Sequence, residues 1–181
     1  YRVTVLDQNI TVKKFLSLPD ERSSTASLPS RGNNNSNGEG IGNLLTRITI
    51  LLDDTSNIDA LKVKLANIKG YDVTSVLPLT EKMFIFACEK LNNIDIITID
   101  TSIGLKYNLS PSMVKTAIRR GLYIEALYGE AVSNESARKF FMSGIADIGR
   151  ATRGGKNLII SSGAENKFCL RRPYDIINLL S

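Results

Sequence analysis

The sequence predicts an α/β fold built on a parallel sheet, because strand-like and helix-like stretches alternate along most of its 181 residues. Short apolar runs rich in β-branched residues recur along the chain, and a stretch with helical spacing of apolar residues fills each gap between them. Repeated units of this kind build a barrel or a doubly wound sheet with right-handed connections. We count about six strand–helix units where a full barrel has eight, so we expect an incomplete barrel.

The N-terminal part predicts one strand followed by an insertion. Residues 1–6 alternate and are rich in β-branched residues, as in a strand. Residues 17–42 are rich in Ser, Asn, Gly and Pro and cannot bury enough apolar surface to order themselves. We therefore expect one domain over residues 1–181 with a flexible insertion loop at 17–42. Because the chain opens with Tyr1 in mid-strand, we also expect both ends to be cut from a longer chain.

From residue 44 onward the pattern is regular. Strands are expected at residues 45–52, 72–77, 94–99, 122–128 and 157–160. Helices are expected at residues 57–69, after the N-cap Thr80, after the N-cap Ser110, from Ser133 or Asn134, and with Pro173 in a first turn. No stretch approaches the roughly 20 apolar residues of a membrane helix, so no membrane partner is expected.

The amino-acid composition excludes several classes of catalytic and metal-binding site. The sequence has no histidine, which excludes imidazole bases, Ser-His-Asp and Cys-His nucleophile systems, and metal sites that contain histidine. Its two cysteines, Cys88 and Cys169, have no spacing typical of a disulfide framework or a zinc site. Residues 149–156 resemble a phosphate-binding loop but precede a strand instead of following one, so nucleotide binding is not expected there.

The positive charge is concentrated in the second half of the chain. Residues 1–100 hold 11 Lys and Arg against 12 Asp and Glu, whereas residues 101–181 hold 12 against 6, a net charge of +6. A basic half favours an acidic partner, most commonly nucleic acid, although a solubilising surface is an equally good interpretation of the charge by itself. Tyr and Phe are not interleaved with the charges, so the sequence gives little support for stacking on single strands.

Four carboxylates offer an alternative, enzymatic interpretation. Asp53, Asp54 and Asp100 follow strands, at the edge where barrel active sites are built, and Glu125 lies within a strand. Together they could hold Mg²⁺ or Mn²⁺ through oxygen ligands. Aspartate after a strand is, however, also the ordinary cap of the following helix, and we favour that interpretation.

Several blocks of the sequence resemble one protein family. They are residues 44–50, residues 71–73 with Pro78 and residues 80–82, residues 117–122 with Glu125 and Tyr128, and residues 155–162 through 172–175. In this order and spacing they are similar to the barrel-like protein subunit of eukaryotic and archaeal ribonuclease P and ribonuclease MRP, a family related to PHP-type phosphoesterase barrels. The resemblance covers nearly all of the chain outside the insertion. The family's additional first strand and helix and its further C-terminal helices are not seen here.

The resemblance implies a TIM-barrel-like fold and a non-catalytic role in a ribonucleoprotein. The RNA would be the catalyst, removing the 5′ leader of precursor tRNA with Mg²⁺ that it binds itself, so no cofactor is expected in the protein. Ribonuclease MRP would add rRNA processing. The implied partners are the ribonuclease P or MRP RNA, precursor tRNA, a small ferredoxin-like subunit and other protein subunits. The implied location is the nucleus and nucleolus.

Candidate RNA-binding residues come from the resemblance and from charge clustering. The resemblance supplies Arg47, Lys82, Arg119, Arg120, Lys156 and Arg172, whereas clustering adds Arg150, Arg153 and Arg171, and the turn after the last strand adds Ser161 and Ser162. We expect these side chains to form a basic rim at one or both faces of the barrel that contacts the RNA backbone. No catalytic or metal-binding residues are expected. A protein-only scaffold and a divalent-metal phosphoesterase using Asp53, Asp100 and Glu125 are the alternatives.

Overall fold

The computed structural model describes residues 4–5, 11–12, 45–53, 58–68, 70–164 and 167–180. Within these residues seven strands form one sheet in the order β1-β7-β6-β5-β4-β3-β2, and every neighbouring pair is parallel. The strands are β1 Thr4–Val5, β2 Thr11–Val12, β3 Thr46–Leu52, β4 Val73–Pro78, β5 Ile96–Ile99, β6 Tyr123–Leu127 and β7 Leu158–Ser161. The predicted parallel α/β architecture is confirmed.

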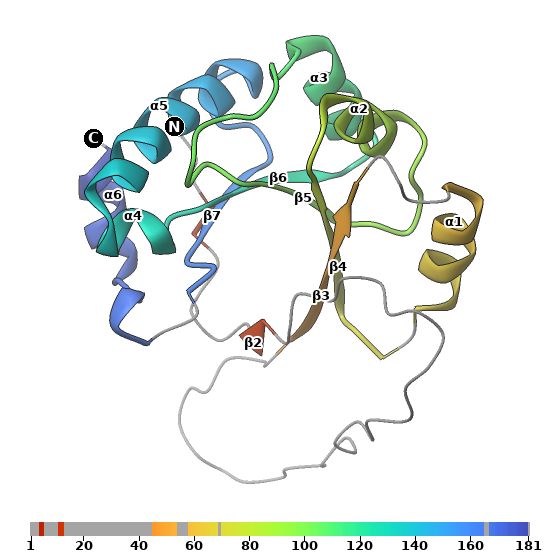
Figure 1. The fold of residues 1–181 in the computed structure, drawn as a ribbon, viewed down its shortest axis with the longest axis horizontal. Coiled ribbons are helices and arrows are strands. Elements are labelled where there is room, and N and C mark those ends of the chain that lie inside the picture. Colours follow the sequence, from red (N-terminus) through yellow and green to blue (C-terminus); the bar gives the residue numbers. More distant parts are fainter. Residues whose placement is uncertain are drawn as a thin grey trace, which may run out of the picture.

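The helices follow the outer side of the curved sheet (Figure 1). They are α1 Ile58–Asn67, α2 Glu81–Glu89, α3 Pro111–Arg119, α4 Gly129–Ser133, α5 Glu135–Ala151 and α6 Pro173–Leu180, with the short 3₁₀-helix η1 at Lys167–Cys169. β1 pairs with β7 and β2 pairs with β3, so the N-terminal segment reaches both edges of the row of longer strands. This arrangement is an incomplete TIM-barrel-like fold with distinct inner and outer faces.

The two faces of the sheet differ in chemistry. On the outer face Ile50, Ile97 and Ile124 are buried in one apolar cluster that includes Phe84 of α2 and Phe141 of α5. Because strand residues alternate between faces, the intervening residues of the same strands point to the inner face. There the buried residues include Arg47, Thr49, Ser75, Thr98 and Glu125. The apolar core therefore lies between sheet and helices, and the inner face carries a buried polar cluster beside apolar residues such as Ile96 and Ile159.

Most of the predicted helix boundaries are confirmed, with one correction. The Thr80 hydroxyl accepts the Met83 N–H at 3.4 Å, and the Asn134 side chain accepts the N–H groups of Ser136 and Ala137, so Asn134 caps α5. Ser110 does occupy the N-cap position of α3, but its hydroxyl is hydrogen-bonded to the Ser112 hydroxyl and makes no side-chain bond to the helix N–H groups.

Some predictions are wrong or fall outside the described residues. The predicted strand 122–128 ends at Leu127, because the five-residue helix α4 starts at Gly129; this helix is too short to give a periodic signal. The insertion 17–42 and Asp54 lie outside the described residues. Among the described helices, none has the length and apolar character needed to cross a membrane.

Two glycines of α5 allow a test of how tightly this helix packs. A Cβ at Gly144 would lie 2.8 Å from Thr101 Cγ2, whereas a Cβ at Gly149 would meet no atom within 4 Å. Gly144→Ala should therefore lower the free energy of unfolding by about 1–2 kcal/mol, since overpacking outweighs the gain in helix propensity. Gly149→Ala should leave it unchanged or raise it by up to about 1 kcal/mol. Urea unfolding of the two variants measures both effects, and equal midpoints would contradict the packing of α5 on Thr101.

Candidate nucleic-acid interface

A buried ion pair crosses the inner face of the sheet. Arg47 of β3 and Glu125 of β6 are 4% and 0% exposed, and two parallel hydrogen bonds of 2.5 Å join Arg47 Nη1 to Glu125 Oε1 and Arg47 Nη2 to Glu125 Oε2. This bidentate geometry is the strongest form of a carboxylate–guanidinium contact. Because β4 and β5 lie between the two strands in the sheet, the pair spans the concave side of the barrel.

Hydroxyl groups from the neighbouring strands complete the hydrogen bonding of both ions. Arg47 Nε donates to Thr49 Oγ1 at 3.1 Å, and Nη2 donates to Ser75 Oγ and Thr98 Oγ1, each at 2.9 Å. Glu125 accepts further bonds from Thr98 Oγ1 at 2.6 Å and from Ser161 Oγ at 2.7 Å. Five strands therefore contribute to one network. A buried ion pair is tolerated where such bonds replace the lost hydration.

This network corrects two predicted RNA contacts. Arg47 is inaccessible and its charge is neutralised by Glu125, so its assignment to the RNA-binding surface is wrong. Ser161 is half-buried and its hydroxyl is committed to Glu125, so its role in the structure is to complete the network. The hydroxyl of Ser162 accepts the Ala164 N–H within the same turn, and the Ser162 carbonyl accepts the Gly129 N–H at 2.7 Å.

The carboxylates proposed for a metal site are not assembled into one. Glu125 is occupied by Arg47, and Asp100 Oδ1 accepts the Ser102 N–H at 3.0 Å and the Ser102 hydroxyl at 2.6 Å. Asp100 therefore holds a local turn and not the predicted helix cap, since the next helix, α3, starts only at Pro111. Within the part of the chain that the structure describes, no three acidic or cysteine side chains are grouped so that they could hold a metal ion.

Burial raises the pKa of Cys88 to about 12, so this thiol behaves as a core side chain.

Arg120 also has a structural role that sequence reasoning missed. Its guanidinium donates to the carbonyl oxygens of Ala87, Cys88 and Leu91 at the C-terminal end of α2. The carbonyls of Ala87 and Cys88 belong to the last turn of α2, where they lack intrahelical partners and carry the negative end of the helix dipole, so a cation satisfies both needs. Arg120 therefore ties α3 to α2, and its side chain is not available to an RNA in this arrangement.

The remaining candidates lie at two opposite edges of the sheet. Lys82 in the first turn of α2, and Arg171 and Arg172 after β7, belong to the edge where the strands end. Arg171 Nη1 donates to the carbonyls of Phe168 and Leu170, which holds the turn before α6 together. Lys82, Arg171 and Arg172 are exposed, and their contact with RNA stays a prediction.

The edge where the strands begin holds a concentrated cationic site. Arg119 ends α3, while Arg153 and Lys156 lie between α5 and β7. Together with Lys115, which the sequence reasoning did not select, they surround a hollow of about 150 Å³ floored by Ile118, Ala151 and Thr152. All four cations are exposed, and none forms an ion pair with a described residue. We call Lys115, Arg119, Arg153 and Lys156 the basic edge.

A tight turn positions two members of the basic edge. Arg153, Gly154, Gly155 and Asn157 all have positive φ, at 56°, 87°, 87° and 52°. The buried hydroxyl of Thr152 holds this turn, since it donates to the Ile148 carbonyl at 2.8 Å and accepts the Gly155 N–H at 3.1 Å. The residues that resembled a phosphate-binding loop thus form a compact reversal between a helix and a strand, and side chains carry its positive charge.

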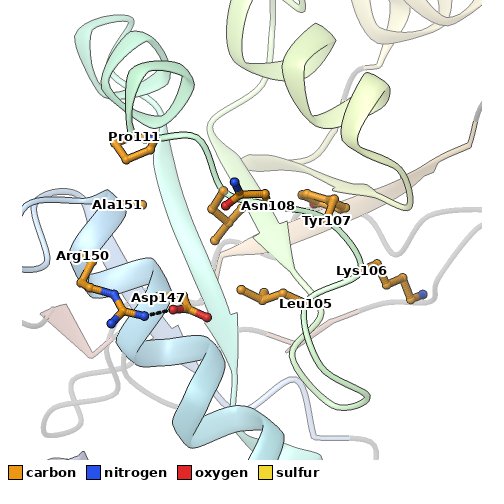
Figure 2. A pocket seen from close by; sticks show the side chains of 9 residues that line it. Leu105, Lys106, Tyr107, Asn108, Pro111, Asp147, Arg150 and Ala151 are labelled. Atoms are coloured by element: carbon orange, nitrogen blue, oxygen red, sulfur yellow. Dashed lines mark hydrogen bonds and ion pairs between the residues drawn. The ribbon is translucent and has the colours of Figure 1, made fainter.

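Arg150 lies beside the basic edge but is paired. It interacts with Asp147 one turn earlier on α5, at the side of a hollow of about 670 Å³ between α5 and residues 105–111 (Figure 2). Arg150 is 77% exposed, and an exposed pair of this kind is worth less than about 1 kcal/mol. Asp147 therefore lowers the net charge here, and contact of Arg150 with RNA stays a prediction.

The fold and these sites define an α/β barrel-type protein with a buried ion-pair network on its inner face and a cluster of four cations at the edge where the strands begin. Comparison with known proteins gives the family. The chain belongs to the family described as "RNase P subunit p30", whose model matches residues 1–181. The resemblance inferred from the sequence is therefore confirmed.

Curated relatives agree with this assignment. The chain is 35% identical over 136 residues to the ribonuclease P protein subunit p30 of Mus musculus, which covers 75% of this chain and 50% of the mouse protein. It is 37% identical over 135 residues to the protein GAMETOPHYTE DEFECTIVE 1 of Arabidopsis thaliana, covering 75% and 23%. It is 28% identical over 137 residues to the ribonuclease P/MRP protein subunit RPP1 of Saccharomyces cerevisiae, covering 76% and 45%. The chain thus matches half or less of each of these relatives.

The buried ion pair supports a direct test. Arg47→Met should lower the free energy of unfolding by about 3–5 kcal/mol, because it leaves the Glu125 carboxylate buried without its counter-ion. Adding Glu125→Leu to that variant should restore much of the loss, since no uncompensated charge then remains. Urea denaturation of the two single variants and the double variant measures the coupling. Strictly additive losses would contradict a direct bond between the two side chains.

Proposed function

We propose that this chain is part of a non-catalytic protein subunit of the ribonuclease P or MRP ribonucleoprotein, and that the basic edge binds the backbone of the RNA. Family membership supports the assembly, and the printed names of the mouse and yeast relatives describe such subunits. The observation that supports the contact is the concentration of Lys115, Arg119, Arg153 and Lys156 around one hollow, with no neutralising carboxylate among the residues that the structure describes. Phosphate groups are the partners that match such a site best.

The work of the particle would then be divided between RNA and protein. The RNA, with Mg²⁺ bound to it, would cut the 5′ leader from precursor tRNA, and this chain would neutralise and brace the folded RNA. For the small ferredoxin-like subunit and other protein partners, we propose contacts on the exposed surfaces of the helices. The same proposal places the protein in the nucleus and nucleolus.

The alternatives make different demands on the described residues. A phosphoesterase using Asp53, Asp100 and Glu125 would need Glu125 to leave Arg47, breaking the buried network. A protein-only scaffold would leave the basic edge as a solubilising surface and would purify without RNA. The phosphoesterase hypothesis therefore has the weakest support. The scaffold hypothesis differs from our proposal in one measurable result, which is whether RNA accompanies the purified protein.

The first test is purification of the tagged full-length protein from its own cells at moderate salt, followed by sequencing of the RNA that accompanies it. We expect one or two abundant structured RNAs and precursor-tRNA cleavage in the same fraction. A variant that combines Arg119→Ala, Arg153→Gly and Lys156→Ala should retain less RNA as salt is raised, since each lost phosphate contact lowers the salt slope by about 1.

Lys139→Ala is the matched control for this test. Lys139 is also an exposed cation, but it pairs with Glu135 at the opposite end of α5. Its replacement should leave RNA recovery unchanged. If the wild-type protein purifies without RNA, the scaffold hypothesis is supported. If Lys139→Ala loses as much RNA as the basic-edge variant, only the overall charge of the protein matters.

Replacing the adjacent residues Arg119 and Arg120 one at a time allows RNA binding and protein stability to be tested separately. Arg119→Ala should change the free energy of unfolding by less than about 0.5 kcal/mol while lowering the salt slope of RNA binding by about 1. Arg120→Ala should instead destabilise the protein by about 1.5–3 kcal/mol, because it strips charged hydrogen bonds from the end of α2. Thermal unfolding and salt-dependent binding of both variants measure the two effects. The reverse pattern would assign the RNA contact to Arg120.

A further inference from the structure

A second hollow opens directly beside the basic edge. It has a volume of about 420 Å³, is lined by Tyr123, Gly154, Gly155 and Leu158, and shares Arg153 and Lys156 with the smaller hollow. The two hollows are adjacent, since Arg153 and Lys156 line both, and the larger one combines these two cations with one aromatic ring. The volume of the larger hollow falls within the range of about 300–1,000 Å³ typical of small-ligand sites.

Tyr123 is placed by the sheet and left partly uncovered. It is the first residue of β6, and its backbone N–H donates to the Asp95 carbonyl at 2.9 Å, which fixes its position at the edge of the sheet. Its side chain lies on the same face as Glu125, two residues further along the strand. Tyr123 is 43% exposed, whereas the next three residues of β6 are buried. Gly154 and Gly155 line the same hollow and bring no side chain over it.

We propose that the larger hollow is a binding site for one unpaired nucleotide of the RNA. The phosphate lies between Arg153 and Lys156, and the base stacks on the Tyr123 ring. This inference rests on the proposed function and adds to it the chemical form of the ligand. The sequence did not suggest stacking, because Tyr123 is thirty positions from Arg153; the parallel neighbours β6 and β7 bring their starting ends together.

An unpaired nucleotide suits the site better than a duplex. A duplex presents its phosphates outward and keeps its bases stacked on one another, so it has no base to offer to a recessed ring. A single-stranded loop or bulge can turn a base out and stack it on an aromatic side chain, while cations hold the adjoining phosphate. A hollow that combines two cations with an exposed aromatic ring fits both halves of such a nucleotide.

The backbone at Arg153 adds an independent observation. Its φ of 56° is a conformation that costs a residue with a side chain more than it costs glycine, and the next two residues are glycines. A third glycine would fit this turn with less strain. The chain instead carries a guanidinium at the junction of the two hollows, which is where a phosphate next to a stacked base would lie.

Binding of two short ligands by the full-length protein tests the inference. Fluorescence anisotropy compares a labelled oligouridylate with an abasic oligomer that has the same number of phosphates. Tyr123→Leu should weaken binding of the oligouridylate about tenfold and leave the abasic oligomer unaffected, because stacking on an aromatic ring contributes about that factor per base. Tyr123→Phe keeps the ring and should bind both ligands as the wild type does.

Arg153→Gly tests the phosphate half of the site without endangering the fold. Because glycine suits the backbone at this position, the variant should unfold at the same or a higher urea concentration than the wild type. It should nevertheless bind both ligands more weakly, with a salt slope lower by about 0.7, as expected for one lost phosphate contact on a single strand. Within the particle purified from cells, ultraviolet irradiation should attach RNA to the peptide that contains Tyr123.

The outcomes separate this inference from the proposed function. If Tyr123→Leu binds the oligouridylate like the wild type while Arg153→Gly lowers the salt slope, the nucleotide site is overturned and backbone binding stands. The same holds if an RNA duplex binds more tightly than the single strand and Tyr123→Leu has no effect. If Arg153→Gly changes neither affinity nor salt slope and no RNA accompanies the purified protein, both proposals fail.

Discussion

The buried pair of Arg47 and Glu125 is the constraint on which the described barrel depends. It links β3 to β6 across the inner face, and hydroxyls from β4, β5 and β7 complete its hydrogen bonds. An apolar interior would tolerate small shifts between strands, whereas this network requires five strands to meet in one register. A buried ion pair contributes little net stability compared with apolar packing, so we regard strand arrangement as its main contribution. The apolar outer cluster supplies the burial that drives folding.

The filled interior has a consequence for where the protein can act. Enzymes with barrel folds place their chemistry at the edge where the strands end and draw on residues that reach inward from them. Here Glu125 and Ser161 reach inward, but each is committed to the network. At the opposite edge, helix ends and the turn from Arg153 to Asn157 leave cations facing solvent around two adjacent hollows. A binding role at the edge where the strands begin is therefore compatible with an interior devoted to holding the strands together.

The sequence predicted the repeating architecture well, because alternating apolar runs, Asn134 and Gly121 are local signals. Gly121 closes α3 with a φ of 85°, as a residue just past a helix end often does. The partners of Arg47 could not be identified locally, since Glu125 lies 78 residues away. A weaker signal was present: Glu125 lies between Ile124 and Ala126, and Arg47 is followed by Ile48, in two predicted strands of one parallel sheet. Two opposite charges in buried strands should have suggested one another as partners.

The basic half of the chain shows why charge alone predicts a surface only approximately. The Arg120 guanidinium donates hydrogen bonds to carbonyls at the end of α2. The Arg138 guanidinium likewise donates to the carbonyls of Ala131 and Val132 in α4. Arg119, adjacent in sequence to Arg120, points instead into the cationic hollow. These arginines differ in whether an uncapped helix end lies within reach of the guanidinium. That distance depends on tertiary packing and cannot be obtained by counting charged residues. The positive charge available to an RNA is thus the part left over after the helices have been capped. Four such cations gather at the edge where the strands begin because α3 and the turn after α5 end there, while Lys82 and Arg172 are exposed at the opposite edge.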